Sequence, residues 1–229
     1  MKVMRNEKHT KSRARVGQWA SLGGMAVLGL GLLISFTRPQ LIGISFACLL
    51  VGLALSQVGL YFTKRWVQRP RPDEVLESAL KGFSNRFELY SFYLPAPHVL
   101  LGPSGLFVLR VQPQEGQITH QAGRWHQKFS VARFMGFSGQ ETVGDPTREA
   151  QSEAQNIAAF LAEHLPDEKI AVQPLIVFTN DKAELSISEP PIPVLPHKKL
   201  KSYLRGPGKG YLPSRQLELL SELFAAQVS

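Results

Sequence analysis

The chain has 229 residues, of which 44% are hydrophobic, and a formal net charge of +8. Its length suits one ordinary domain with an attachment, and its one cysteine, Cys48, excludes an internal disulfide. Residues 1–71 hold eleven Lys and Arg but a single Glu, whereas residues 72–229 hold 15 basic and 17 acidic residues. The sequence pI of about 9.7 therefore does not by itself indicate a DNA-binding protein.

Two uncharged, mostly apolar runs follow one another near the N-terminus, at residues 16–36 and 41–62. Each has about the 20 residues that a helix needs to cross the hydrocarbon core of a bilayer. Only Thr37-Arg-Pro-Gln40 separates them, and Pro39 favours a break there. The sequence therefore predicts two antiparallel transmembrane helices. A cleaved secretory signal is disfavoured for two reasons. The apolar part of such a signal is usually about 7 to 15 residues long, shorter than residues 16–36, and in this chain a second apolar run follows directly.

Basic residues flank this pair of helices. We assign residues 1–15 to a basic tail and residues 63–72 to a basic linker that contains proline, whereas the turn holds only Arg38. The positive-inside bias then predicts a cell-membrane protein with two spans and cytoplasmic N- and C-termini, whose basic segments lie on the lipid bilayer. The helices could approach closely at small residues, which are Gly23, Gly24, Gly29 and Gly31 in the first run and Gly43, Ala47, Gly52 and Ala54 in the second. Alternatively, the glycines simply reflect how common glycine is in membrane helices.

Residues 73–229 combine helical and strand patterns, which predict one cytoplasmic α/β domain. Asp73 is expected to cap a helix that ends near residue 83, and a strand is expected at 86–94. Two further strands, 99–101 and 106–111, surround the turn signal Gly102-Pro-Ser-Gly105. The remaining expected elements are a helix from Asp145-Pro146, a buried strand at 172–178, short strands at 185–187 and 193–195, and helices at 198–204 and 214–226.

Several motifs of this domain occur in an unbroken order. They are Asp73-x-x-Leu-x-x-x-Leu80, His98-Val-Leu-Leu-Gly-Pro-Ser-Gly-Leu-Phe-Val-Leu109, Gly116-x-Ile118, Asp145-Pro146, Pro174-Leu-Ile-Val-Phe-Thr179, Pro191-Ile-Pro-Val-Leu195 and Lys199-Leu-Lys-Ser-Tyr-Leu204. The series resembles the nuclease-related domain (NERD) over roughly residues 73–205. The resemblance implies an α/β fold with a restriction-endonuclease-like central mixed sheet flanked by helices, here preceded by a transmembrane helical hairpin.

In that family an Asp precedes the hairpin His, and the second strand carries Glu-x-Lys. The resemblance implies that the two carboxylates hold a divalent cation and that the Lys stabilises charge at the nucleophile. In this sequence the matching positions are Pro97, Arg110 and Gln112. Gly105 and Gly116 fix the alignment on both sides, so a shift of one residue does not restore the motif.

These replacements predict that the nuclease chemistry is lost. Exchanging Glu for Arg turns an attraction for the metal ion into a repulsion, and unit charges 4 Å apart interact by roughly 4 kcal/mol at an effective dielectric near 20. We therefore expect no catalytic residue, no metal site and no cofactor. A weaker acidic position of the family corresponds to Asp73, which a helix cap explains equally well.

Arg110 has two interpretations. Either Arg110 contacts a phosphate in place of the lost metal, or it lies with Gln112 on an exposed face of the strand, where both side chains are in water. The second is favoured.

One alternative retains activity through a relocated Mg²⁺ or Mn²⁺ site built from Glu88, Glu115 and Asp145. We favour the interpretation of these three residues as solvated side chains, with Asp145 as a helix cap. The predicted function is thus a membrane-anchored, catalytically inactive NERD-like module that binds nucleic acid weakly or serves as a scaffold for a protein partner. The alternative function is an active metal-dependent nuclease.

Overall fold

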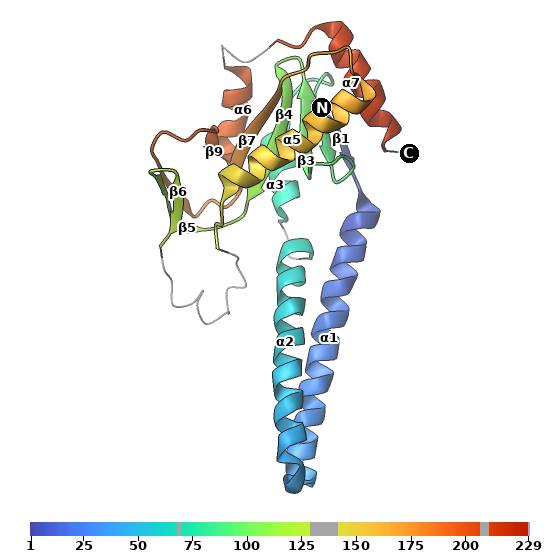
Figure 1. Cartoon of the computed structure of the whole chain (residues 1–229), viewed down its shortest axis with the longest axis vertical. Helices are drawn as coiled ribbons and strands as arrows, with labels where there is room; N and C mark the ends of the chain where they lie inside the picture. The colour runs from blue at the N-terminus through green and yellow to red at the C-terminus, as the bar shows by residue number, and fades with distance from the viewer. Residues whose placement is uncertain (68–69, 129–141, 207–210, 229) are drawn as a thin grey trace. The chain divides into compact units, whose positions relative to one another are not determined.

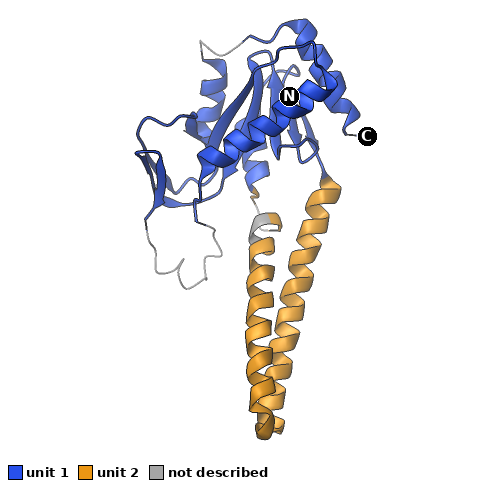
Figure 2. Ribbon diagram, in the orientation of Figure 1, with its two compact units in different colours: residues 1–6, 72–129, 141–229 blue, residues 7–71, 130–140 orange. Residues whose placement is uncertain are grey.

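The computed structural model describes the chain except residues 68–69, 129–141, 207–210 and 229, and the side chains of residues 64–65 (Figure 1). The chain divides into two compact units (Figure 2). Residues 7–71 make up most of one unit, which we call the helical hairpin. Residues 1–6 and most of residues 72–229 form the other, which we call the sheet unit.

The helical hairpin consists of α1 (Glu7–Thr37), a short 3-10 turn (Pro39–Leu41) and α2 (Ile42–Trp66). Both helices are long and apolar enough to cross a membrane, over Glu7–Thr37 and Pro39–Thr63. Helix α1 begins nine residues before the apolar run at residue 16, so the basic residues that follow Glu7 are helical and do not form an irregular tail.

A seam of small residues brings α1 and α2 together. Gly17, Gly24 and Gly31 recur every seven residues along α1, as Gly52 and Gly59 do along α2. A Cβ on Gly24 would lie 2.6 Å from the Ser56 hydroxyl, whereas one on Gly23, Gly29 or Gly43 would meet no atom within 4 Å. The seven-residue repeat and the close backbone approach are typical of tightly packed membrane helices. The predicted role in close approach therefore agrees with the packing at Gly24, Gly31 and Gly52 but is wrong for Gly23, Gly29 and Gly43.

In the residues that the structure describes, the sheet unit contains two sheets and four helices. The larger, mixed sheet has the order β1 (Lys2–Arg5), β2 (Glu88–Ser91), β3 (His98–Gly102), β4 (Gly105–Gln112), β7 (Val172–Phe178) and β9 (Val194–Pro196). The smaller sheet has the order β6 (Arg124–Gln127), β5 (Gly116–Gln121) and β8 (Ala183–Ile187). The helices are α3 (Pro72–Ala79), α5 (Pro146–His164), α6 (His197–Arg205) and α7 (Ser214–Ala226).

Helices cover both faces of the mixed sheet (Figure 1). Alternate residues of β4 point to opposite sides, so Leu106 and Val108 pack in a cluster with α5 and α7, while Phe107 and Leu109 pack with α3 and α6. The predicted fold class, a mixed sheet flanked by helices together with two candidate membrane-spanning helices, is confirmed.

The N-terminal residues differ from the expected tail. Lys2–Arg5 form the edge strand β1, parallel to β2 with Lys2 opposite Glu88 and Arg5 opposite Ser91. The Lys2 amide donates to the Phe87 carbonyl over 2.9 Å, and the Lys2 ammonium lies 2.8 Å from a Glu88 carboxylate oxygen. The helical hairpin is therefore inserted between the first strand and the remainder of the sheet unit.

Glu88 is a buried carboxylate that connects β1, β2 and α7. It accepts hydrogen bonds from Lys2 (2.8 Å), Tyr90 (2.8 Å) and Ser221 (2.9 Å). Burial raises the pKa of Glu88, but these three hydrogen bonds, with the charge of Lys2, lower it more, so the pKa lies below its ordinary value. Burial and the neighbouring carboxylate raise the pKa of the Tyr90 hydroxyl.

We predict that Glu88→Gln lowers the free energy of unfolding by about 1–3 kcal/mol near pH 7, because it removes a charged acceptor of three hydrogen bonds. The unfolded chain binds the Glu88 proton more readily than the folded chain does. Wild-type protein should therefore lose this stabilisation as the pH falls below the ordinary value of 4.5.

Chemical denaturation of the full chain in detergent, followed by circular dichroism near pH 7 and near pH 3, measures the effect. The gap between wild type and Glu88→Gln should narrow at the lower pH. Glu163→Gln, which changes an exposed carboxylate of α5, is the matched control and should have little effect. An equal gap at both pH values would contradict the assignment.

Candidate functional site

The predicted hairpin is formed by β3 and β4. Gly102 pairs with Gly105 at its tip, and Leu100 pairs with Phe107 farther along. Gly105 has a φ of +130°, and a Cβ there would lie 2.8 Å from the Gln173 side chain, so glycine is needed at this turn. The register of this hairpin determines the direction of the side chains at the positions of the nuclease-related motif, Arg110 and Gln112.

Pro97 and His98, at the start of the hairpin, make hydrogen bonds within the sheet unit. Pro97 precedes β3, and its carbonyl accepts a 2.8 Å hydrogen bond from the Phe92 amide. His98 is buried, with its Nδ1 atom 3.1 Å from the Ser91 hydroxyl. Neither residue offers a carboxylate to a metal ion.

Arg110 is held by two carboxylates of α5. Its guanidinium lies 2.6 Å from a Glu149 oxygen and 2.7 Å from a Glu153 oxygen. The Arg110 and Glu153 side chains are 21% and 12% exposed, so their ion pair is largely shielded from water, whereas the Glu149 side chain is 44% exposed. The arrangement contradicts the favoured prediction of a solvated strand face, because Arg110 faces α5 and pairs with it.

Local sequence positions the two acidic partners. Asp145 caps α5 by accepting a 3.1 Å hydrogen bond from the Arg148 amide, and Pro146 occupies the first turn, as predicted. Glu149 and Glu153 are then one turn apart on the same side of α5. Sequence reasoning missed both glutamates. The signal was two acidic residues four positions apart beside the apolar stripe of a helix, with no basic residue between them on that face. Such a pair indicates a basic side chain on another element.

Gln112 lies two residues beyond Arg110 and is also buried, at 2% exposure. Its backbone carbonyl accepts a 2.9 Å hydrogen bond from the Thr179 amide at the end of β7. Its side chain is a neutral amide, so it supplies no positive charge where the family has Lys. The prediction that Gln112 lies on an exposed face is wrong.

The residues at this site do not fit a divalent metal. The cluster of Arg110, Glu149 and Glu153 carries one fixed cation between two anions, which leaves a single negative charge for any added ion. Across the described residues, no group of three or more His, Cys, Asp or Glu could hold a metal ion. Magnesium and manganese need several oxygen ligands, which this cluster has already committed to a guanidinium.

The residues proposed for a relocated metal site are separated by their contacts. Glu88 binds Lys2, Tyr90 and Ser221, whereas Asp145 caps α5. Glu115 lies between β4 and β5, and its carbonyl accepts a 2.8 Å hydrogen bond from Gln127. Within the described ranges these three carboxylates form no metal-binding group.

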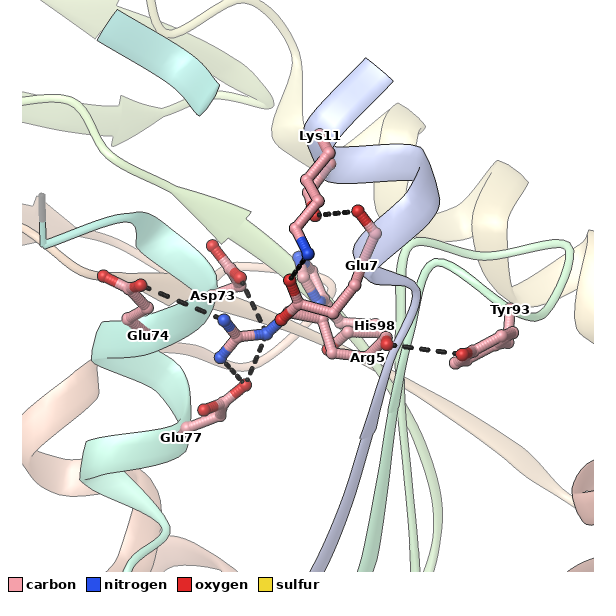
Figure 3. A network of polar contacts seen from close by, with 10 residues as sticks. Arg5, Glu7, Lys11, Asp73, Glu74, Glu77, Tyr93 and His98 are labelled. Atoms are coloured by element: carbon pink, nitrogen blue, oxygen red, sulfur yellow. Dashed lines mark hydrogen bonds and ion pairs between the residues drawn. The ribbon is translucent and has the colours of Figure 1, made fainter. Parts of the chain in front are cut away.

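A second arginine is surrounded by acids at the start of α3 (Figure 3). The Arg5 guanidinium lies 3.3 Å from Asp73 and 3.9 Å from Glu74, and it also pairs with Glu77. Asp73, the position aligned with a weaker acidic residue of the family, is thus bound to an internal cation as well. Each of the two acidic clusters, one on α5 and one on α3, is therefore paired with an arginine of this chain.

Comparison with known protein families gives a match within the sheet unit. Residues 73–179 match the model of the family described as the nuclease-related domain. No curated protein and no solved structure matches the chain. Residues 73–179 therefore match the nuclease-related domain, and they follow two helices that are long and apolar enough to form a membrane anchor.

Proposed function

We propose that this protein is a membrane-anchored, non-cutting member of the nuclease-related domain family, which acts as a binding or scaffolding module at the cytoplasmic face of the cell membrane. The observation that carries the proposal is the Arg110 guanidinium held between Glu149 and Glu153. It puts a fixed positive charge where the family's metal-binding Glu would be.

The electrostatics support inactivity. Opposite unit charges about 4 Å apart attract by roughly 4 kcal/mol at an effective dielectric near 20, and the same distance gives an equal repulsion between Arg110 and each charge of a divalent cation. Glu149 and Glu153 offset that repulsion only if they release Arg110. Metal binding and the Arg110 ion pairs therefore exclude each other.

The same ion pairs weigh against Arg110 as a phosphate contact. A phosphate would have to displace two carboxylates at 2.6 and 2.7 Å, and it would approach a cluster with a net negative charge. Any nucleic acid or protein partner is better served by another surface of the sheet unit.

The position of β1 supports an anchor with both ends on one side of the membrane. Residues 2–5 pair with β2, and the chain re-enters the same unit at Pro72. A sheet cannot be completed across a bilayer, so the segment between must cross an even number of times. Cleavage after α1 would also remove an edge strand. The basic residues beside both spans then favour the cytoplasm for the sheet unit.

The first prediction from this proposal concerns cleavage. The full chain in detergent, with Mg²⁺ or Mn²⁺, should not cut single- or double-stranded DNA above the level of a mock purification. The full chain is needed because a fragment beginning near residue 72 lacks β1. Metal-dependent cleavage that co-purifies with the protein and disappears in Glu149→Gln or Glu153→Gln would overturn the proposal.

The second prediction concerns the ion pairs. Arg110→Gln should lower the free energy of unfolding by about 1–3 kcal/mol, because it leaves two partly buried carboxylates one turn apart without a cation. Adding Glu153→Gln to Arg110→Gln should restore part of that loss. Arg148→Gln, an exposed neutralisation on the same helix, is the control and should change stability little. Additive effects of Arg110→Gln and Glu153→Gln would show that the two residues do not interact.

The third prediction concerns topology. With Cys48→Ser as background, Lys8→Cys at the start of α1 and Lys169→Cys in the sheet unit should react with a membrane-impermeant maleimide only after cells are permeabilised. Gln40→Cys, between the two helices, should react in intact cells. Reaction of positions 8 and 169 from opposite sides would contradict a hairpin anchor.

A further inference from the structure

One region of the sheet unit has a strongly positive charge although the unit as a whole does not. Residues 190–217 contain six Lys and Arg and no Asp or Glu. Four of the six belong to α6 and its immediate end: Lys198, Lys199, Lys201 and Arg205. No acidic residue occurs in residues 78–87 either, the segment that follows α3 and carries Lys81.

Helix α6 is firmly seated on the sheet. Leu200 and Leu204 are buried in the cluster that contains α3 and the β4 residues Phe107 and Leu109. Because Leu200 and Leu204 point inward, the polar side of α6 faces away from the core and presents its cations on a rigid surface.

Contacts with the end of α3 position two of these cations. The Lys201 ammonium donates to the Lys81 carbonyl over 2.6 Å, and Arg205 donates to the Gly82 carbonyl over 3.4 Å. The Arg205 guanidinium also lies 5.0 Å from the centre of the Phe83 ring. These carbonyls orient the two side chains but carry no full charge, so they do not themselves cancel the positive charge.

Most of the cationic groups on this surface lack an acidic partner. Lys198 pairs with Asp181 at 2.8 Å. For Lys81, Lys199, Lys201 and Arg205, the described part of the structure contains no ion pair with a carboxylate. We call these four residues the α6 cationic surface.

The spacing of these charges suits a chain of phosphates. Lys201 and Arg205 are one helical turn apart, about 6 Å along α6, which approximates two steps of a nucleic-acid strand at about 3.4 Å each. An ammonium has three donors and a guanidinium five, so donors remain after the bonds to the α3 carbonyls. No buried pocket is needed for such contacts, because backbone phosphates are exposed on the nucleic acid.

Anionic lipid fits this surface less well. Both leucines of α6 are buried, so the helix has no apolar side chain of that kind to insert into a bilayer.

We infer that the α6 cationic surface is a binding site for the phosphate backbone of nucleic acid, separate from the hairpin motif and independent of metal. The inference deepens the proposed non-cutting function and rests on it only for the absence of cleavage. It names the surface and the partner: Lys81, Lys199, Lys201 and Arg205 contact phosphates without reading the base sequence.

The test uses the full chain in nanodiscs of zwitterionic lipid, with EDTA present, and a labelled oligonucleotide of about 20 nucleotides in single- and double-stranded form. Lys199→Glu is the main variant, because Lys199 is exposed and makes no ion pair with a described residue. It should weaken binding about tenfold at low salt and reduce the slope of log Kd against log salt by about one or more. Lys169→Glu, an exposed reversal on the loop between α5 and β7, is the matched control and should retain most of the affinity.

The outcomes separate the hypotheses. Absent binding, or equal weakening by Lys199→Glu and Lys169→Glu, would overturn the inference. Binding of wild-type protein only to phosphatidylserine vesicles, and not to the oligonucleotide, would overturn it in favour of a lipid-binding surface. Loss of the probe by metal-dependent cleavage when EDTA is replaced by Mn²⁺ would instead overturn the proposed non-cutting function, while the EDTA measurement would still decide the binding surface.

Discussion

The parallel pairing of β1 with β2 is the constraint on which the rest of the architecture depends. Four residues at the start of the chain pair with four residues that follow 86 positions later, and a buried carboxylate, Glu88, reinforces the pairing through Lys2. Arg5 then joins the same strand to α3 through Asp73 and Glu77. Both ends of the helical hairpin are consequently tied to one folded unit, and the hairpin is an insertion within a domain and not a leader attached to it.

Two arginines of the chain, Arg110 and Arg5, pair with the acidic clusters of the domain. The resemblance to the nuclease-related domain implies a metal held by one carboxylate just before β3 and another on β4. Here Arg110 replaces one of them, and Glu149 and Glu153 of α5 balance its charge. At the start of α3, Arg5 has the same relation to three acidic residues. In both places the attraction between opposite charges is satisfied within the chain, which stabilises the packing of a helix on the sheet and leaves little to attract a metal.

Elements with strong local patterns could be predicted from the sequence. The strand at 172–178 and the helix at 214–226 coincide with β7 and α7, because a continuous apolar run and a helical apolar stripe identify them without long-range information. The strand β1 was missed because Lys2-Val-Met-Arg5 has too few residues to show alternation and pairs with a distant segment. Strands β5 and β6, around Gly123, were not assigned for a similar reason: their exposed polar residues obscure the alternation.

The candidate site was predictable in part for related reasons. The positions of Pro97, Arg110 and Gln112 follow from a local turn, Gly102-Pro-Ser-Gly105, that fixes the register. The partners of Arg110 lie 39 and 43 residues away on α5, and neither the burial of Gln112 nor the direction of Arg110 can be derived from strand alternation alone. The charge of α6 was hidden by the average over the domain, since its cations are offset by acids located elsewhere.

The place of β1 in the sheet also orders the events of synthesis. The ribosome makes this strand before the helical hairpin, and the segment that pairs with it is completed only after the whole hairpin has emerged. In the proposed topology, both helices enter the bilayer while β1 is still unpaired, and the mixed sheet can gain its edge strand only if residues 2–5 remain on the side where residues 88–91 appear. The sheet can therefore be completed only in a chain whose hairpin crosses the membrane twice. A chain inserted with one crossing would leave Glu88 buried without Lys2, and its sheet unit would be less stable.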